Sequence, residues 1–311
     1  MLRKYLVGFW IVLGVAAVAS GQTIQVAGSD LLQAAVGEPL AQYARQNGLD
    51  VKVDFYGTVP ALALLKQDKV QLAVIAAPVG QQPSSKDYQV IPYAYQVAYV
   101  LVNADNPITE VDRDQLIGVF GVGQSMDINQ WVQLGVTGDW ASKPIMAVTT
   151  SGDDGVVVEL FKHTILGTSD LKPSVMVLPS GNDLAKTISD NPNVIAVGRY
   201  APDKSKALYV AFAHTGTAIG TTTDTASAAA AADVGGSKVS FAPTEENVYN
   251  GDYPLRLPFY IVYKAANKDK VRELLRVLLS EEFAAHLRDQ HFMPVPDTER
   301  KRALLELDNP K

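Results

Sequence analysis

The sequence predicts an α/β protein that is built from two lobes. The chain alternates short apolar strands with helices over residues 23–76, and it repeats this alternation over residues 144–197. Two further segments, residues 94–102 and 259–263, are aromatic and β-branched runs that are too apolar for exposed strands. Because a chain that passes between two lobes twice needs two buried crossover strands, we expect these two segments to join the lobes.

The first α/β unit is expected to form a parallel sheet. Its predicted helices follow the turn Gly28-Ser29-Asp30 and the pair Gly57-Thr58, which are residue types that begin helices. The predicted strands span residues 23–27, 51–55 and 70–76, and the helices span residues 31–46 and 58–65. Alternating strands and helices imply right-handed crossovers, and such sheets bind ligands at the carboxyl ends of their strands.

The second unit repeats this pattern after the first crossover. Thr109 is the expected cap of a helix over residues 108–120. The loop of residues 149–155 separates a predicted strand from the helix that follows it. The remaining elements are strands at residues 144–148, 172–178 and 194–197, and helices at residues 156–166 and 183–188.

The C-terminal part returns to the first lobe. Thr244 is the expected cap of a short helix that precedes the second crossover. Residues 268–290 form an amphipathic helical stretch that Ser280 divides in two, and we expect it to pack on the first lobe. Residues 293–296 are predicted to end the ordered chain. The Thr/Ala-rich residues 215–232 are predicted to be a mobile surface segment or, in their alanine-rich part, a short helix.

Composition and the N-terminus indicate an exported protein. The 311 residues are 47% hydrophobic and 19% charged, which is ordinary for a globular chain. The formal net charge of −6 argues against binding of nucleic acid. Residues 1–21 read as a signal peptide, with basic Arg3-Lys4 before an apolar stretch and small residues at its end. There is no cysteine, so disulfides and thiolate metal sites are excluded.

Two motifs at the crossovers carry a family resemblance. The second crossover reads Pro243-Thr244, Asn247-Val248 and Gly251-Asp252-Tyr253-Pro254-Leu255, and the first crossover ends at Asn106-Pro107. These motifs resemble those of the periplasmic phosphate-binding proteins of ABC importers, and the resemblance covers about residues 24–295. It implies a type II periplasmic solute-binding fold, with residues 22–98 and 258–311 in lobe 1 and residues 99–257 in lobe 2. It also implies a small-molecule or inorganic anion ligand, a membrane ABC permease as partner, and a monomer without cofactor.

The resemblance places a ligand site on three loops between the lobes. The family holds phosphate with backbone N–H groups, hydroxyls, one arginine and one proton-accepting acid. Onto this chain the resemblance maps seven candidate residues: Ser29, Asp30, Thr58, Thr150, Ser151, Asp154 and Gly155.

The chain departs from the family at the charged positions. With the third loop aligned on Phe161, the arginine of the family falls at Thr150; the alternative register, with Ser151-Gly152-Asp153 as the family's tripeptide, also lacks an arginine. The acid expected near Ala76 is missing. Asp30, Asp153 and Asp154 are expected to cap their own helices and to repel an anion. Arg199 or Arg256 is a candidate replacement cation.

These departures leave three readings open. In the first, a solute-binding protein takes a ligand altered from phosphate, and in the second an envelope interaction module keeps a vestigial cleft. In the third, phosphate is captured with Arg199 or Arg256 pointing inward. A catalytic or metal site is not expected, because the serines lack a His/Asp partner and the four histidines lack metal-binding spacing.

Overall fold

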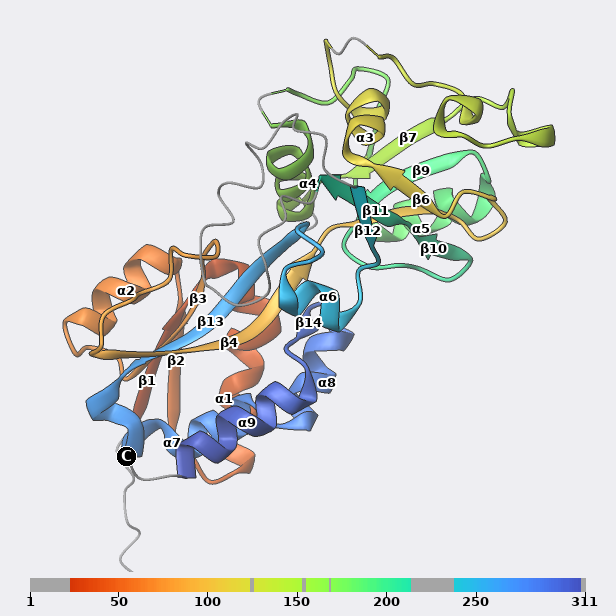
Figure 1. Ribbon diagram of the computed structural model, residues 1–311. Coiled ribbons are helices and arrows are strands. Elements are labelled where there is room, and N and C mark those ends of the chain that lie inside the picture. The colour runs from red at the N-terminus through yellow and green to blue at the C-terminus, as the bar shows by residue number, and fades with distance from the viewer. Residues whose placement is uncertain (1–22, 124–125, 153–154, 168, 214–237, 309–311) are drawn as a thin grey trace, which may run out of the picture.

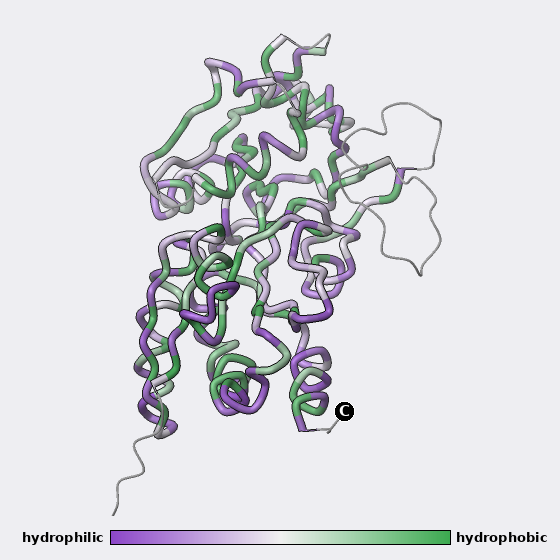
Figure 2. The backbone as a smooth tube through the Cα atoms, turned by 90° about the vertical axis from the view of Figure 1, so that its left-hand side faces the viewer, coloured by the Kyte–Doolittle hydropathy of each residue, from purple (hydrophilic) through white to green (hydrophobic). Residues whose placement is uncertain are grey.

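The computed structural model describes residues 23–123, 126–152, 155–167, 169–213 and 238–308, and these form two α/β lobes joined by two crossovers (Figure 1). The predicted signal peptide and the Thr/Ala-rich residues 215–232 lie outside the described residues, as do Asp153 and Asp154. In Figure 2 the two lobes lie one above the other, and the helices of the lower lobe carry both hydrophilic and hydrophobic residues. Among the described residues, no helix combines the length and apolar character that crossing a membrane requires.

The first lobe is built on a six-stranded sheet in the order β14-β4-β13-β3-β1-β2. Its first three strands are parallel, as the sequence predicts, whereas β13 and β4 join them antiparallel, so the whole sheet is mixed. The strands are β1 (Ile24–Gly28), β2 (Val51–Phe55), β3 (Leu72–Ala76), β4 (Tyr88–Val97), β13 (Arg256–Lys264) and β14 (Met293–Pro294).

Helices cover both faces of this sheet. On one face lie α1 (Glu38–Gln46), α7 (Lys268–Leu278), α8 (Glu281–Asp289) and α9 (Asp297–Asp308), and on the other lies α2 (Thr58–Lys66) (Figure 1). The division of residues 268–290 at Ser280 is confirmed, because its hydroxyl accepts a hydrogen bond from Phe283 N at 3.1 Å. The helix predicted over residues 31–46 is regular only in α1; before it the chain forms a 3₁₀ turn, Asp30–Leu32, and a π turn, Gln33–Gly37.

The chain does not fray after residue 296, which corrects the prediction. It continues as α9, whose Leu307 packs into the core of the first lobe. Arg300 of α9 is 2% exposed, donates to Val295 O at 2.8 Å and pairs with Glu281 of α8. These tertiary contacts stabilise a helix whose own sequence is mostly polar.

The second lobe has a five-stranded sheet in the order β10-β5-β9-β7-β8 and a three-stranded sheet in the order β12-β11-β6. The five-stranded sheet contains β5 (Tyr99–Asn103), β7 (Met146–Thr150), β8 (Met176–Leu178), β9 (Val194–Gly198) and β10 (Ser205–Ala207). The small sheet contains β6 (Glu110–Asp112), β11 (Tyr209–Ala213) and β12 (Lys238–Phe241). The α-helices of this lobe are α3 (Arg113–Phe120), α4 (Gly155–Phe161) and α5 (Gly181–Asp190); shorter turns are Trp131–Leu134, Gly138–Trp140 and Lys162–Leu166.

Three predicted boundaries in this lobe were wrong. The loop predicted over residues 149–155 begins later, because Thr149 and Thr150 belong to β7. Helix α3 is capped by Asp112 rather than Thr109: the Asp112 carboxylate accepts from Gln115 N, and the Gln115 side chain accepts from Asp112 N. The reason is that residues 110–112 pair with β11 as a strand, which delays the helix. The strand predicted over residues 172–178 is reduced to the three residues of β8.

The crossovers lie side by side between the lobes. The segment predicted as one strand, residues 94–102, is two strands in different sheets, β4 and β5, which meet at Ala98. The chain returns through α6 (Glu245–Asn250), which Thr244 caps by accepting from Asn247 N as predicted, and enters β13. Tyr253 is fully buried and donates its hydroxyl to Ala98 O at 2.8 Å, so the two crossovers are hydrogen-bonded to each other.

Candidate ligand site between the lobes

Strand register makes the carboxyl ends of both parallel strand sets face each other. In the first lobe, Ala76 at the end of β3 pairs with Phe259 near the start of β13, on the crossover side. In the second lobe, Gly198 at the end of β9 pairs with Tyr99 at the start of β5, again on the crossover side. Because β1, β2 and β3 run together, as do β7, β8 and β9, every loop after these strands lies toward the opposite lobe.

The first two loops of lobe 1 are held side by side. Ser29 N donates to Val74 O at 2.8 Å, and Gly57 N donates to Gly28 O at 2.9 Å. A Cβ on Gly28 would lie 2.6 Å from the Phe55 ring, so only glycine fits above this buried phenylalanine. Gly57 has φ of +124°, which an L side chain rarely adopts. Both glycines are therefore required by the shape of the loops.

The first loop is not closed by a side-chain cap. Ser29 is the N-cap residue of the 3₁₀ turn, is 2% exposed, and makes no side-chain cap hydrogen bond. Asp30 is the next residue and is exposed. The expectation that Asp30 caps its own helix is therefore not met. Asp154 and its neighbour Asp153 lie outside the described residues, so their predicted capping remains a prediction.

The second loop uses its hydroxyl for structure. Thr58 Oγ1 donates to Ala76 O and accepts from Ala76 N, both at 3.0 Å. This pair of bonds ties the start of α2 to the end of β3. Thr58 thus satisfies the backbone of Ala76, the position at which the family resemblance would place an acid.

The second-lobe wall contains a buried hydroxyl of a different kind. Thr150 ends β7 and is 2% exposed, and its Oγ1 has no hydrogen-bond partner among the described residues. Ser151, next in the chain, is exposed, and both its N–H and its hydroxyl donate to Leu178 O, at 2.8 and 3.3 Å. Gly155 begins α4 with no atom within 4 Å of where a Cβ would stand. Among the described hydroxyls of this loop, that of Thr150 is therefore the one without a hydrogen bond, and it is shielded from solvent.

Arg199 and Arg256 occupy different places. Arg199 follows β9 and donates from Nη2 to Gln290 O of the first lobe at 2.6 Å. Arg256 lies at the second crossover, where Nη1 donates to Val248 O and, at 2.9 Å, to Tyr249 O. Its guanidinium also lies 5.3 Å from the Tyr95 ring centroid. Of the two candidate cations, Arg199 is the one at the strand ends, whereas Arg256 binds the C-terminal carbonyls of α6.

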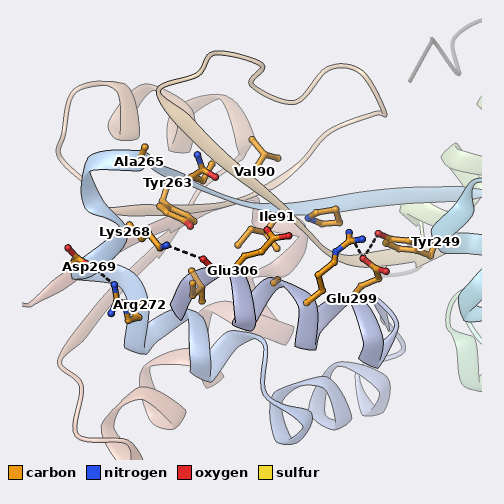
Figure 3. Close-up of a pocket in the computed structure, with 15 residues that line it drawn as sticks. Val90, Ile91, Tyr249, Tyr263, Ala265, Lys268, Asp269, Arg272, Glu299 and Glu306 are labelled. Carbon is orange, nitrogen blue, oxygen red and sulfur yellow. Dashed lines mark hydrogen bonds and ion pairs between the residues drawn. The ribbon is translucent and has the colours of Figure 1, made fainter. Parts of the chain in front are cut away.

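A separate cavity of about 930 Å³ lies on the first lobe, between the outer part of β4 and helices α7 and α9 (Figure 3). Ile91 and Tyr263 line it from the sheet. At its edges Tyr249 donates to Glu299 at 2.9 Å, and Lys268 donates to Glu306 O at 3.0 Å. Sequence reasoning did not find this cavity because it treated the α9 segment as frayed. In the part of the chain that is described, no group of His, Asp or Glu residues is arranged to hold a metal ion.

Comparison with protein families identifies the fold. The model of the "PBP superfamily domain" matches residues 14–282, which is most of the chain. The chain belongs to the PBP superfamily. The resemblance to the periplasmic phosphate-binding family that the crossover motifs indicated is thereby confirmed, together with the two-lobed fold.

Individual relatives agree with this assignment. The phosphate-binding protein PstS of Pseudomonas aeruginosa is 26% identical over 250 residues, covering 78% of this chain and 69% of that protein. Among solved structures, PstS from Borrelia burgdorferi has a TM-score of 0.63 at 15% identity, over 88% of this chain and 99% of that one. A possible phosphate binding protein from Planctomyces limnophilus has a TM-score of 0.62 at 18% identity, over 93% and 99%. At such identities the structures establish the shared fold.

Proposed function

We propose that this chain is an exported solute-binding protein, which captures a small polar solute between its lobes and delivers it to a membrane ABC permease. The proposal extends to this chain what its relatives' names state, namely binding of phosphate and membership of an ABC-type transport system. It includes export through residues 1–21 and a lobe division at residues 98/99 and 257/258. Closure of the lobes around the solute would present the permease with a defined surface.

The observation that carries the proposal is the unpartnered hydroxyl of Thr150. A buried polar group without a partner costs free energy, and such groups in folded proteins are normally satisfied by protein, water or ligand. Thr150 lies at the end of β7, where the loops of the opposite lobe face it. In the first lobe, the Ser29 loop likewise lacks a side-chain cap hydrogen bond.

We further propose that the solute is less negatively charged than phosphate. The family resemblance places an arginine at Thr150 and a proton-accepting acid near Ala76. At Ala76 this chain instead has backbone groups that are hydrogen-bonded by the Thr58 hydroxyl. Phosphate carries one to two charges and is usually bound by a bidentate arginine. Arg199 is hydrogen-bonded to Gln290 O of the opposite lobe and would have to leave this contact to bind phosphate in the same way. Hydroxyl and backbone groups suit a neutral solute or a weakly charged one.

A thermal-shift panel of sugars, amino acids and oxyanions tests this function. The sample for this test is the chain from Gln22 onward. Thr150→Val is the matched variant, because valine keeps the shape of the threonine side chain and removes its hydroxyl. We expect at least one non-phosphate solute to raise the melting temperature of the wild type and to do so less in Thr150→Val. If every compound leaves the melting temperature unchanged, solute binding is contradicted, and the fold serves as an interaction module of the cell envelope.

A further inference from the structure

A set of contacts joins the lobes beside the crossovers. Arg199 and Tyr200 follow β9 in the second lobe and meet residues 290–292, which link α8 to β14 in the first. Arg199 Nη2 donates to Gln290 O at 2.6 Å, and the guanidinium lies 5.9 Å from the Phe292 ring centroid. The Tyr200 and His291 rings stack with centroids 3.9 Å apart and planes inclined by 10°.

These contacts are chemically well matched. Gln290 is the C-cap of α8, so its carbonyl belongs to the negative end of a helix, where a guanidinium is favoured. His291 has φ of +59°, a conformation that a residue other than glycine adopts where its surroundings stabilise it. This turn aims Gln290 O and the His291 ring toward the second lobe. Stacked rings and a short hydrogen bond both weaken steeply when their partners move apart.

The contacts lie close to the crossovers, about which the lobes would rotate. Gly198, immediately before Arg199, pairs with Tyr99, which follows the first crossover residue Ala98. On the other side, Met293, immediately after Phe292, pairs with Tyr95, just before that crossover. The contacts therefore connect the two sheets a few residues from the point where the chain passes between them. Any rotation of one lobe against the other about the crossovers must change the geometry of the Tyr200–His291 stack.

We propose that Arg199 and Tyr200, packed against Gln290 and His291, form a brace that sets the angle between the lobes. With the brace intact the lobes keep a narrow range of angles. Without it the crossovers and the remaining contacts between the lobes, namely the ion pair of Arg288 with Glu245 and the Tyr249–Glu299 hydrogen bond, determine the angle, so the lobes open further and over a wider range. The proposal concerns the fold and does not depend on which solute the cleft takes.

The lack of native cysteine makes the lobe angle directly measurable. Gln67→Cys in the first lobe and Lys186→Cys in the second place one spin label on each lobe, both at exposed positions. Double electron–electron resonance spectroscopy then gives the distribution of distances between the two spin labels in the otherwise native chain. We expect a narrow distribution for the labelled parent. Tyr200→Ala and His291→Ala are each expected to broaden it and to move it away from the parent distance.

Matched variants separate the brace from general effects. Tyr209→Ala and His163→Ala remove an exposed tyrosine and an exposed histidine elsewhere on the second lobe and should leave the distribution unchanged. His291→Asn keeps a residue that tolerates positive φ but removes the stacked ring, so it should behave like His291→Ala. The double variant Tyr200→Ala/His291→Ala should equal either single variant, because one contact is lost in all three.

The proposal is overturned if the Tyr200→Ala and His291→Asn distributions superimpose on that of the parent while all three proteins remain folded. If Tyr200→Ala fails to fold, Tyr200→Leu and His291→Asn carry the same test. A broadening equal to that of the control variants would also contradict the brace.

Discussion

The two walls of the cleft use a threonine at a strand-associated loop in opposite ways. In the first lobe, the hydroxyl of Thr58 makes two hydrogen bonds to the backbone of Ala76 and is fully engaged. In the second lobe, the hydroxyl of Thr150 is buried and has no partner among the described residues. The same residue type thus stabilises the backbone in the first lobe and is left without a hydrogen bond in the second. A hydroxyl at a strand end therefore indicates a ligand-binding group only if it is not already hydrogen-bonded to the backbone.

We expect the largest change in folding stability from the ionisation of two tyrosines at the first crossover. Tyr95 lies on β4 in the first lobe, and Tyr99 lies on β5 in the second lobe. Burial raises the pKa of each phenol to about 12, with Arg256 opposing the shift at Tyr95 and Glu245 adding to it at Tyr99. In the unfolded chain a tyrosine ionises near pH 10. Each phenol therefore stabilises the fold fully below pH 10, and this contribution is lost as the pH rises to 12. The loss is about 2–3 kcal/mol per tyrosine.

Urea unfolding at pH 8, 10, 11 and 12 measures this loss. Tyr95→Phe and Tyr99→Phe remove one ionisable group each, so each variant should lose less stability than the wild type between pH 10 and 12. A steeper or equal loss in both variants would contradict the burial of these phenols.

Thr58→Val should have the next largest effect. The substitution leaves the N–H and C=O of Ala76 without the partner they have now, and we expect a loss of about 1–3 kcal/mol in the free energy of unfolding. Thr150→Val is the matched control: its hydroxyl has no bond to lose and costs free energy while buried, so the variant should be as stable as the wild type or more stable. Equal losses in the two variants, measured by denaturant unfolding, would remove the distinction between the walls.

Binding should reverse this order. With the solute that gives the largest thermal shift in the panel, Thr150→Val is expected to bind about tenfold more weakly, which corresponds to about 1.4 kcal/mol. Calorimetric titration of both proteins with that solute measures the difference. Unchanged affinity in Thr150→Val would show that the buried hydroxyl does not contact the solute.

Ser151→Ala should have the smallest effect. Its hydroxyl makes one exposed hydrogen bond, at 3.3 Å, to Leu178 O, which also accepts from Ser151 N at 2.8 Å. Because the backbone bond remains, the expected loss is below about 0.5 kcal/mol. A loss as large as that of Thr58→Val would mean that this loop depends on the Ser151 side chain.

The sequence predicted those features that depend on neighbouring residues. The caps Thr244 and Ser280 were found because each precedes its helix with the right residue type and spacing. The cap of α3 was missed because it depends on the pairing of β6 with β11, far away in the chain. Helix α9 was missed because its polar sequence hides the burial of Arg300 and Leu307 by other elements.

The candidate ligand site stays a prediction, and sequence reasoning placed its loops but not the state of each side chain. The resemblance located Ser29, Thr58 and Thr150 at strand ends that the structure brings to the crossover side of each lobe. Whether a hydroxyl is engaged, as in Thr58, or unpartnered, as in Thr150, depends on backbone atoms of other strands. The contact of Arg199 with Gln290 likewise joins residues that are 91 positions apart and has no local signature.

The proposal that most needs testing is that the solute is not phosphate, because Thr150 stands where the family resemblance places an arginine. The most direct test is calorimetric titration of the chain from Gln22 onward with inorganic phosphate, at neutral pH and moderate salt. We expect the titration to show heats of dilution only, with no saturable binding of phosphate. Saturable one-to-one binding of phosphate in the micromolar range or tighter would contradict it and would indicate that Arg199 leaves Gln290 to bind the anion.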